Sequence, residues 1–208
     1  NDYVVPNTVV EDGEVDANYF QHLDYLEDFN EKNGTHLVSA AGIHYEPMGI
    51  FPGKDKSATL DKIADGAKIA IPNDTTNEAR ALQLLVAEGL IELDPEAGLE
   101  ATPKDVTKNE HKIEFVEMEA AALPTVLADV DFAVINGNYA LGAGLTEADG
   151  LAFEAADSEA AKTYTNALVV KEGNEDNPAI KKLVEALTSD ECRAFLEEKY
   201  KGMVIPVF

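Results

Sequence analysis

A strand–turn–helix pattern between Ala67 and Gly89 constrains the fold of this chain more than any other stretch. Its first five residues are an apolar-leaning run typical of a buried strand, and Pro72 ends the run because proline cannot donate to a strand ladder. Thr75 and Glu78 have the spacing of a capping box, so a helix is predicted to begin there and to end at the final glycine. In an open α/β sheet such a turn lies at the carboxyl edge, where ligands bind.

Strand and helix patterns alternate along the rest of the chain, which favours an α/β fold with parallel sheets. The predicted strands are residues 15–17, 37–43, 113–118, 132–135 and 165–170, with an irregular continuation of the second at 46–51. The predicted helices are residues 4–12, 18–33, 55–63, 120–128, 178–187 and 190–200. Residues 11–17 are similar to residues 127–133, which suggests two similar lobes.

Acidic residues dominate the charge of this 208-residue chain, whose formal net charge is −24. Neither nucleic acid nor an anionic membrane surface is expected as a partner, because both require a basic patch. Cys192 is the only cysteine, so neither a disulfide framework nor a cysteine metal cluster is expected. No apolar run is long enough to span a bilayer. The chain opens at Asn1 close to a helix and without a signal peptide, which we interpret as a trimmed start.

Arg80 is the first candidate ligand residue because it lies early in the predicted helix. It follows Asn77 by three residues, so the two side chains share one helix face. The chain has only two arginines against fourteen lysines, and the positive end of a helix dipole does not favour a cation there. A guanidinium beside unpaired helix N–H groups suits a carboxylate ligand. The alternative is a solvated arginine on a surface helix.

Polar and aromatic side chains follow other predicted strands. They are Phe20, His22 and Tyr25 after the first strand, and Asn136, Asn138 and Tyr139 after a later one. His44 and Glu46 alternate in an extended segment and therefore point to the same side. One cation, several amides and an aromatic wall together specify an amino acid with a long uncharged side chain.

Each part of such an amino acid has a predicted partner. Arg80 would bind the carboxylate, and either Glu46 or the carbonyl oxygen of Asn136 would accept hydrogen bonds from the ammonium group. The aromatic residues that would surround the apolar side chain are Phe20, Tyr25 and Tyr3.

Metal binding, nucleophilic catalysis and cofactor binding are weaker hypotheses. His22, His44 and Glu46 are plausible metal ligands, but no pair has the close spacing of a zinc motif, so no metal is expected. The sequence has neither a G-x-S-x-G motif nor a Walker or G-x-G-x-x-G loop, so no catalytic residue and no cofactor is predicted. His22 as a general base stays open as an alternative.

Several stretches closely resemble the methionine-binding lipoproteins (NlpA/MetQ family), the solute receptors of methionine ABC importers. In family order they are residues 1–7 (NDYVVPN), 16–22 (DANYFQH), 46–49 (EPMG), 71–82 (IPNDTTNEARAL), 99–106, 119–121 with 123–124, and 135–140 (INGNYA). These stretches run across nearly the whole chain, and together they are highly specific.

The resemblance implies a non-enzymatic receptor with a two-lobed periplasmic-binding-protein fold (type 2-like), whose ligand cleft between the lobes closes on L-methionine. One lobe would contain residues 1–44 and 141–208 and the other residues 45–140, with crossover strands near 44–48 and 138–141. The implied partner is a membrane permease–ATPase complex, and the implied location is extracytoplasmic, with a lipid anchor on an N-terminal cysteine. The chain departs from the family pattern in lacking its first strand, first helix and lipobox, so a truncated N-terminus is expected.

By position, the resemblance also assigns ligand-binding residues. The aromatic and imidazole side of the pocket would be Tyr3, Phe20, His22, Tyr25 and His44. Arg80 would be the carboxylate clamp, and the polar anchors would be Asn77 and Asn136. Tyr139 and Glu46 are further assigned contacts. Three alternatives stay open: the same fold with a different apolar amino acid or a small dipeptide, an enzyme on a binding-protein-like scaffold, and a metal receptor.

Overall fold

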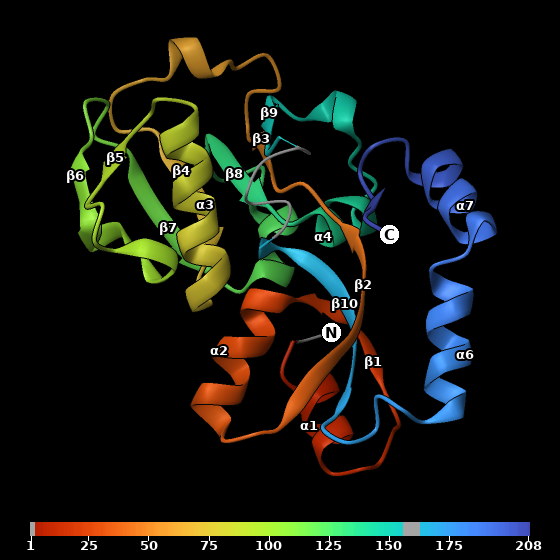
Figure 1. Ribbon diagram of the computed structural model, residues 1–208. Helices are drawn as coiled ribbons and strands as arrows, with labels where there is room; N and C mark the ends of the chain where they lie inside the picture. Colours follow the sequence, from red (N-terminus) through yellow and green to blue (C-terminus); the bar gives the residue numbers. More distant parts are fainter. Residues whose placement is uncertain (1–2, 156–162) are drawn as a thin grey trace. The chain divides into compact units, whose positions relative to one another are not determined.

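The computed structural model describes residues 3–155 and 163–208, and the chain divides into two compact units (Figure 1). The first unit contains residues 1–46 and 155–208, and the second contains residues 47–154. The chain therefore leaves the first unit after Glu46 and returns to it after Glu154.

The second boundary between the units differs from the prediction. The chain returns after Glu154, whereas the sequence predicts a boundary at 140/141 and a crossover strand at 138–141. Those residues instead belong to the helix α4 (Gly137–Gly142), and β9 (Ala152–Phe153) then pairs with β3 (Gly49–Pro52) inside the second unit. A strand of two residues is too short to leave a periodic pattern in the sequence. The first boundary lies two residues later than the predicted 44/45.

Four antiparallel strands form the sheet of the first unit, in the order β1-β10-β2-β11. They are β1 (Asn18–His22), β2 (Leu37–Tyr45), β10 (Thr165–Lys171) and β11 (Ile205–Pro206). The prediction of parallel-dominated sheets is wrong for this unit, because β10 lies between β1 and β2 and runs opposite to both. An apolar pattern locates a strand but does not record its direction.

Helices cover both faces of this sheet (Figure 1). They are α1 (Val5–Glu11), α2 (Leu23–Asn33), α6 (Pro178–Leu187) and α7 (Asp190–Tyr200). Val10 of α1 and Leu26 of α2 pack with Ala167 and Val169 of β10 in one core. Ile180 of α6 packs with the alternate residues of β10 in a second core. This alternation is what a strand buried on both faces requires.

The helix α2 begins at Leu23, later than the helix that the sequence predicts over residues 18–33. Asn18 and Gln21 have the spacing of a capping box, which would start the helix at Asn18, but they do not cap it. Both amides bond to α1 instead. Asn18 Nδ2 donates to Asn7 Oδ1 at 2.9 Å, and Asn7 Nδ2 donates to Gln21 Oε1 at 2.8 Å. These bonds hold the segment extended in β1, and His22 becomes the N-cap of α2.

Parallel and antiparallel pairs share the sheet of the second unit, whose order is β7-β4-β8-β3-β9. Its further strands are β4 (Lys68–Pro72), β7 (Glu114–Met118) and β8 (Phe132–Ile135). β4 is parallel to both β7 and β8, whereas β3 is antiparallel to β8 and β9. The expected parallel arrangement is therefore found among β7, β4 and β8, around the strand that the sequence predicts after Ala67.

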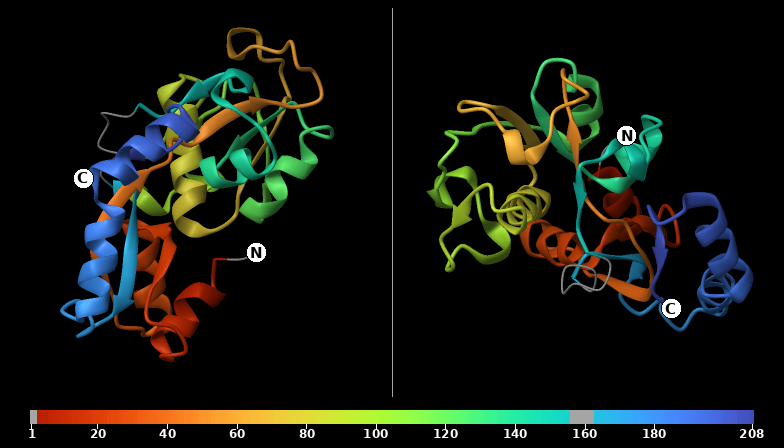
Figure 2. Two further views of the ribbon diagram at one scale, coloured as in Figure 1. Left: turned by 90° about the vertical axis from the view of Figure 1, so that its right-hand side faces the viewer. Right: turned by 90° about the horizontal axis from the view of Figure 1, so that it is seen from above.

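The helix α3 (Thr75–Ala87) follows β4 and packs against the sheet of the second unit (Figure 2). Its Ala79, Leu82 and Leu85 are fully buried in the apolar core of this unit. The N-cap is Asp74, whose side chain accepts from the backbone N–H of Asn77, so the predicted capping box one residue later is wrong. The chain turns at the predicted glycine after α3, in the left-handed region.

Short elements complete the second unit. They are the 3-10 helices η1 (Leu60–Lys62), η2 (Gly98–Glu100), η3 (Pro103–Asp105), η4 (Ala120–Val126) and η5 (Glu147–Asp149), and the hairpin of β5 (Glu92–Leu93) with β6 (Val106–Lys108). The helices predicted at 55–63 and 120–128 are reduced to η1 and η4, and Pro124 inside η4 lacks the N–H that an α-helix needs. Among the described helices, none combines the length and apolarity that crossing a bilayer requires.

Candidate functional site

A buried ion pair joins two distant segments of the second unit. The guanidinium of Arg80 donates from Nε to Glu154 Oε1 at 2.8 Å and from Nη2 to Glu154 Oε2 at 2.6 Å. The arginine side chain is 3% exposed and the glutamate side chain 7% exposed. The same carboxylate accepts from the backbone N–H of Met48 at 2.8 Å. The guanidinium is therefore held in a fixed, two-bonded orientation, and it is not the solvated surface arginine of the alternative reading.

A chain of hydrogen bonds lies at the start of α3. Asp74 Oδ1 accepts from the Asn77 side-chain amide at 2.7 Å, and Asn77 Oδ1 accepts from Asn136 Nδ2 at 2.7 Å. Asn77 and Asn136 are 1% and 6% exposed. The remaining oxygen of Asn136, Oδ1, is buried and has no hydrogen-bond partner among the described residues. This oxygen can accept a hydrogen bond from a ligand.

Tyr139 lies in the first turn of α4, three residues after Asn136, the N-cap residue of that helix. The tyrosine side chain is half-buried. Four of the predicted ligand residues therefore belong to the second unit. They are Asn77, Arg80, Asn136 and Tyr139.

An aromatic group forms in the first unit. Tyr3 lies 5.8 Å from Phe20 and 5.7 Å from Tyr25 between ring centroids, and Phe20 lies 6.3 Å from Tyr25. The His22 ring lies 6.2 Å from Tyr25 and 5.0 Å from Tyr164. The structure thus gathers four residues that the sequence predicts for the apolar side of the pocket, and it adds Tyr164. Asn1 and Asp2, which belong to the same matching stretch as Tyr3, lie outside the described residues.

His22 has a structural role within this group. Its Nδ1 accepts the backbone N–H of Tyr25 at 3.0 Å, as the N-cap of α2. A ring nitrogen that accepts this bond carries no proton, so the neutral ring holds its proton on Nε2. The imidazole orientation is therefore set by the start of the helix.

His44 and Glu46 form a separate cluster in the first unit. His44 Nε2 lies 2.7 Å from Glu46 Oε1, so the two side chains do share one side of their extended segment. The other ring nitrogen of His44 contacts the hydroxyl of Tyr19. Burial and the nearby carboxylate of Glu46 raise the pKa of the Tyr19 hydroxyl above its ordinary value. His22 and His44 pair with the same residue of β10 from opposite sides, so they lie two strands apart.

Three residues of these groups escape the sequence analysis. Glu154 lies 74 residues from Arg80, and nothing local to it indicates a partner. Tyr164 directly precedes the predicted strand at 165–170, and a search for aromatic residues at both ends of each predicted strand would have found it. Tyr19 lies in the stretch that resembles the family, but its neighbour Phe20, and not Tyr19, is predicted among the aromatic residues of the pocket.

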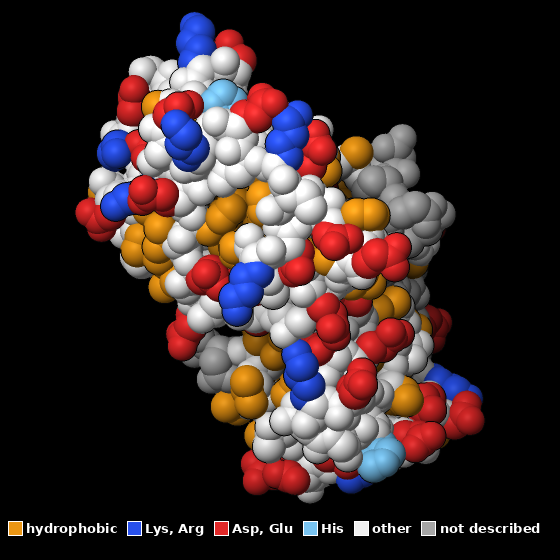
Figure 3. All heavy atoms as spheres, turned by 90° about the vertical axis from the view of Figure 1, so that its left-hand side faces the viewer, with side chains coloured by type: hydrophobic (Ala, Val, Ile, Leu, Met, Phe, Trp, Pro, Cys, Tyr) orange, Lys and Arg blue, Asp and Glu red, His pale blue; other side chains and the backbone are white. Residues whose placement is uncertain are grey.

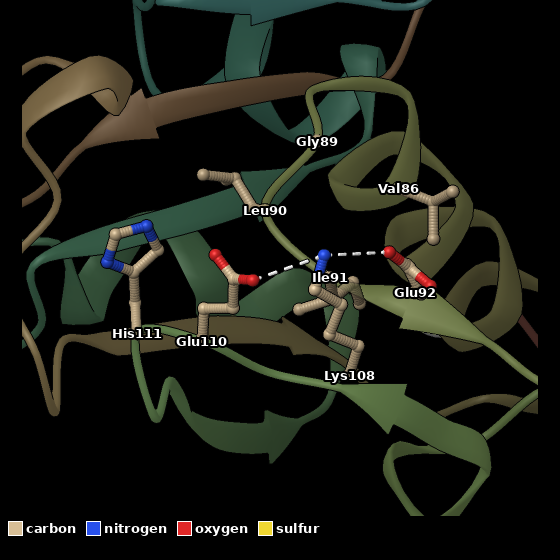
Figure 4. Close-up of a pocket in the computed structure, with 8 residues that line it drawn as sticks. All are labelled: Val86, Gly89, Leu90, Ile91, Glu92, Lys108, Glu110 and His111. Atoms are coloured by element: carbon tan, nitrogen blue, oxygen red, sulfur yellow. Dashed lines mark hydrogen bonds and ion pairs between the residues drawn. The ribbon is translucent and has the colours of Figure 1, made fainter.

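The predicted ligand residues could also serve as metal ligands or as the walls of pockets in the described part of the chain. No group of three or more His, Cys, Asp and Glu side chains in the described residues is placed to hold a metal ion. A pocket of about 380 Å³ lies beside η1, with Lys54, Asp131 and Phe132 in its wall. A second pocket, of about 250 Å³, lies at the end of α3 (Figure 4). Neither pocket is lined by a predicted ligand residue.

The charged side chains around the pocket in Figure 4 are already paired with one another. Lys108 Nζ lies 3.0 Å from Glu92 Oε1 and 3.2 Å from Glu110 Oε1. More broadly, on the face shown in Figure 3 the lysine and arginine side chains lie singly among aspartates and glutamates. This interspersed surface fits the strongly negative net charge of −24.

Known proteins are similar to this chain over nearly its whole length. The chain matches the NlpA lipoprotein family over residues 1–208. The D-methionine-binding lipoprotein MetQ of Escherichia coli (strain K12) is 40% identical to it over 205 residues, which cover 97% of this chain and 73% of MetQ.

Solved structures are similar over the whole chain. A lipoprotein from Ruminococcus gnavus ATCC 29149 is 57% identical, with a TM-score of 0.96, and the match covers 100% of this chain and 85% of that one. A nutrient binding protein from Burkholderia cenocepacia, bound to methionine, is 42% identical, with a TM-score of 0.94, and the match covers 100% of this chain and 86% of that one.

Proposed function

Because this chain belongs to the NlpA lipoprotein family, we propose that it is the solute receptor of a methionine ABC importer and that it captures L-methionine. The family consists of substrate-binding transport proteins and not of enzymes. Two similar proteins support methionine as the ligand, since one is named for D-methionine and the other was solved with methionine bound.

The observation that carries the proposal is the buried guanidinium of Arg80, three residues after Asn77 on α3. Glu154 fixes the orientation of the guanidinium, whose charge would bind the ligand carboxylate. The buried oxygen of Asn136 would accept from the ligand ammonium. A free amino acid presents this pair of charged groups on one carbon atom.

The aromatic group of the first unit would contact the ligand side chain. Tyr3, Phe20 and Tyr25 have ring centroids within 6.3 Å of one another. A thioether makes favourable contacts with ring edges, which suits methionine better than a branched aliphatic side chain. His22, His44, Glu46 and Tyr139 are further proposed contacts, and the bond from His44 orients Glu46.

Delivery to a membrane permease–ATPase complex completes the proposed function. As a lipoprotein receptor, the protein would be extracytoplasmic and held at the membrane by a lipid anchor. Its cargo would be released to the permease rather than chemically changed.

The cargo is tested by identifying the ligand that the purified protein retains. The protein is denatured, and the released small molecules are identified by mass spectrometry. Calorimetric titration of the ligand-free protein then compares L-methionine, D-methionine, norleucine and a methionine dipeptide. We expect L-methionine to be retained and to bind most tightly. Retention of a dipeptide or another amino acid, with no heat on adding either methionine enantiomer, would overturn the assignment.

The role of Arg80 is tested by substitution. Arg80→Ala should weaken methionine binding by about 2–4 kcal/mol, because the ligand carboxylate loses a buried partner. Arg80→Lys keeps the charge beside Glu154 but not the planar fork, so it should weaken binding less. Arg193→Ala is the matched control, since that guanidinium lies over the ring of Phe208. Unchanged affinity in both Arg80 variants would contradict the assigned role.

A further inference from the structure

The direction of the hydrogen bonds at the start of α3 is set by one residue, Asp74. A single oxygen of this carboxylate accepts from both the backbone N–H of Asn77, at 3.2 Å, and its side-chain amide, at 2.7 Å. An ionised carboxylate can only accept hydrogen bonds. The side chain of Asn77 must therefore turn its NH₂ group toward Asp74.

The orientation of Asn136 follows from that of Asn77. With its NH₂ group bonded to Asp74, Asn77 offers its oxygen to Asn136. Asn136 must therefore donate from its own NH₂ group, and its Nδ2 lies 2.7 Å from Asn77 Oδ1. Only the oxygen of Asn136 remains, and this atom is buried without a partner among the described residues. Burial raises the pKa of Asp74, while the hydrogen bonds from Asn77 favour its ionised form.

Resting on the proposed function, we propose that Asp74 is a positioning residue for ligand recognition. It acts through Asn77 and Asn136, so that the site presents an acceptor oxygen to the ammonium group of an α-amino acid. Without this constraint each amide could rotate, and Asn136 could present its NH₂ group instead. A donor facing the ammonium would repel it. This chain of hydrogen bonds from Asp74 through Asn77 to Asn136 therefore selects ligands that carry an amine beside the carboxylate.

The test separates this role from helix capping. Asp74→Ser retains a capping oxygen for one N–H group, but a hydroxyl can also donate and does not fix the amide of Asn77. Asp74→Asn keeps an acceptor oxygen that can serve both groups of Asn77. Calorimetry or competition binding measures L-methionine and its analogue without the amino group, 4-(methylsulfanyl)butanoate, on each variant. Asp61→Ser, at an exposed position of the same unit, controls for the lost charge.

We expect Asp74→Ser to weaken L-methionine binding by about 10-fold or more, as for the loss of a hydrogen bond to a charged group, while binding of the analogue changes by less than about 3-fold. Asp74→Asn should restore most of the methionine affinity. An equal loss for both ligands, or no loss for methionine, would overturn the proposal. If the serine variant does not fold, Asp74→Thr provides the same comparison. A wild-type protein that binds neither methionine enantiomer would instead overturn the proposed function itself.

Discussion

Arg80 and Glu154 show how the protein itself holds a buried charge in one orientation. Both side chains are removed from water, so each needs the other's charge. Glu154 is also fixed by the backbone N–H of Met48. The pair therefore stabilises the second unit and also holds the guanidinium ready for a carboxylate.

Replacing Glu154 with glutamine should lower the stability of the ligand-free protein. The substitution leaves the buried guanidinium without a compensating charge, and we expect the free energy of unfolding to fall by about 3 kcal/mol. Denaturant unfolding followed by circular dichroism measures this change. Glu147→Gln, at an exposed position of η5, should have no comparable effect. Equal stabilities of the two variants would show that the pair contributes little.

Glu78, in the first turn of α3, has an unusual pKa. Burial together with the neighbouring carboxylates of Glu117 and Asp74 raises its pKa from 4.5 to about 7, and Lys104 opposes this shift weakly. The folded protein therefore keeps the Glu78 proton up to about pH 7, whereas the unfolded chain loses it near pH 4.5. In this window the folded state binds more protons, so this residue makes the free energy of unfolding fall as the pH rises.

Glu78→Gln should remove that dependence. Relative to the wild type, the variant should gain about 2 kcal/mol in unfolding free energy between pH 4.5 and pH 8. Urea unfolding at several pH values measures the gain, with the exposed Glu88→Gln as the matched control. A constant difference between the two proteins across this pH range would contradict the pKa shift.

At the scale of single residues, the sequence identified the side chains that follow predicted strands. Asn77, Arg80 and Asn136 are all buried in one unit as polar groups, and Tyr3, Phe20, His22 and Tyr25 gather in the other. Glu154 could not be found, because an ion pair across 74 residues leaves no spacing pattern. Asp74 was overlooked because Thr75 fits a capping motif one residue later.

At the scale of elements, long-range hydrogen bonds determine the secondary structure and strand direction where the local sequence pattern fits more than one arrangement. Asn18 and Gln21 have the spacing of a capping box, but the side chain of Asn7 bonds to both and holds them in β1. The direction of β10 is likewise set by its neighbours β1 and β2. In contrast, β4, α3 and β8 follow from local sequence, because an apolar run and a helix start are local properties.

The buried amide cluster of Asn7, Asn18 and Gln21 should be a source of stability for the first unit. Asn7 is fully buried, and Asn7→Ala would remove one hydrogen-bond partner from each of the Gln21 and Asn18 amides. We expect a loss of about 2 kcal/mol in unfolding free energy. Thermal and urea unfolding measure it, with Asn174→Ala at an exposed position as control. A loss no larger than the control's would mean that water replaces the missing bonds.

At the scale of the whole molecule, each unit has apolar cores of its own. One large core lies in the second unit, and separate cores lie on the two faces of the sheet in the first. The sequence resemblance predicted two lobes but misplaced the return of the chain, because β9 is too short to recognise. Two units with separate cores can unfold as separate cooperative transitions.

Calorimetric melting can therefore show which units contact the ligand. If methionine binds to Arg80 and Asn136 of the second unit and to the aromatic group of the first, saturating methionine should raise the melting temperature of both transitions or merge them. At 1,000 times the dissociation constant the stabilisation should reach about 4 kcal/mol. Arg80→Ala should reduce both shifts, and Arg193→Ala should reduce neither. A shift confined to one transition would mean that a single unit carries the binding site, and the proposed contacts of the other unit would then be wrong.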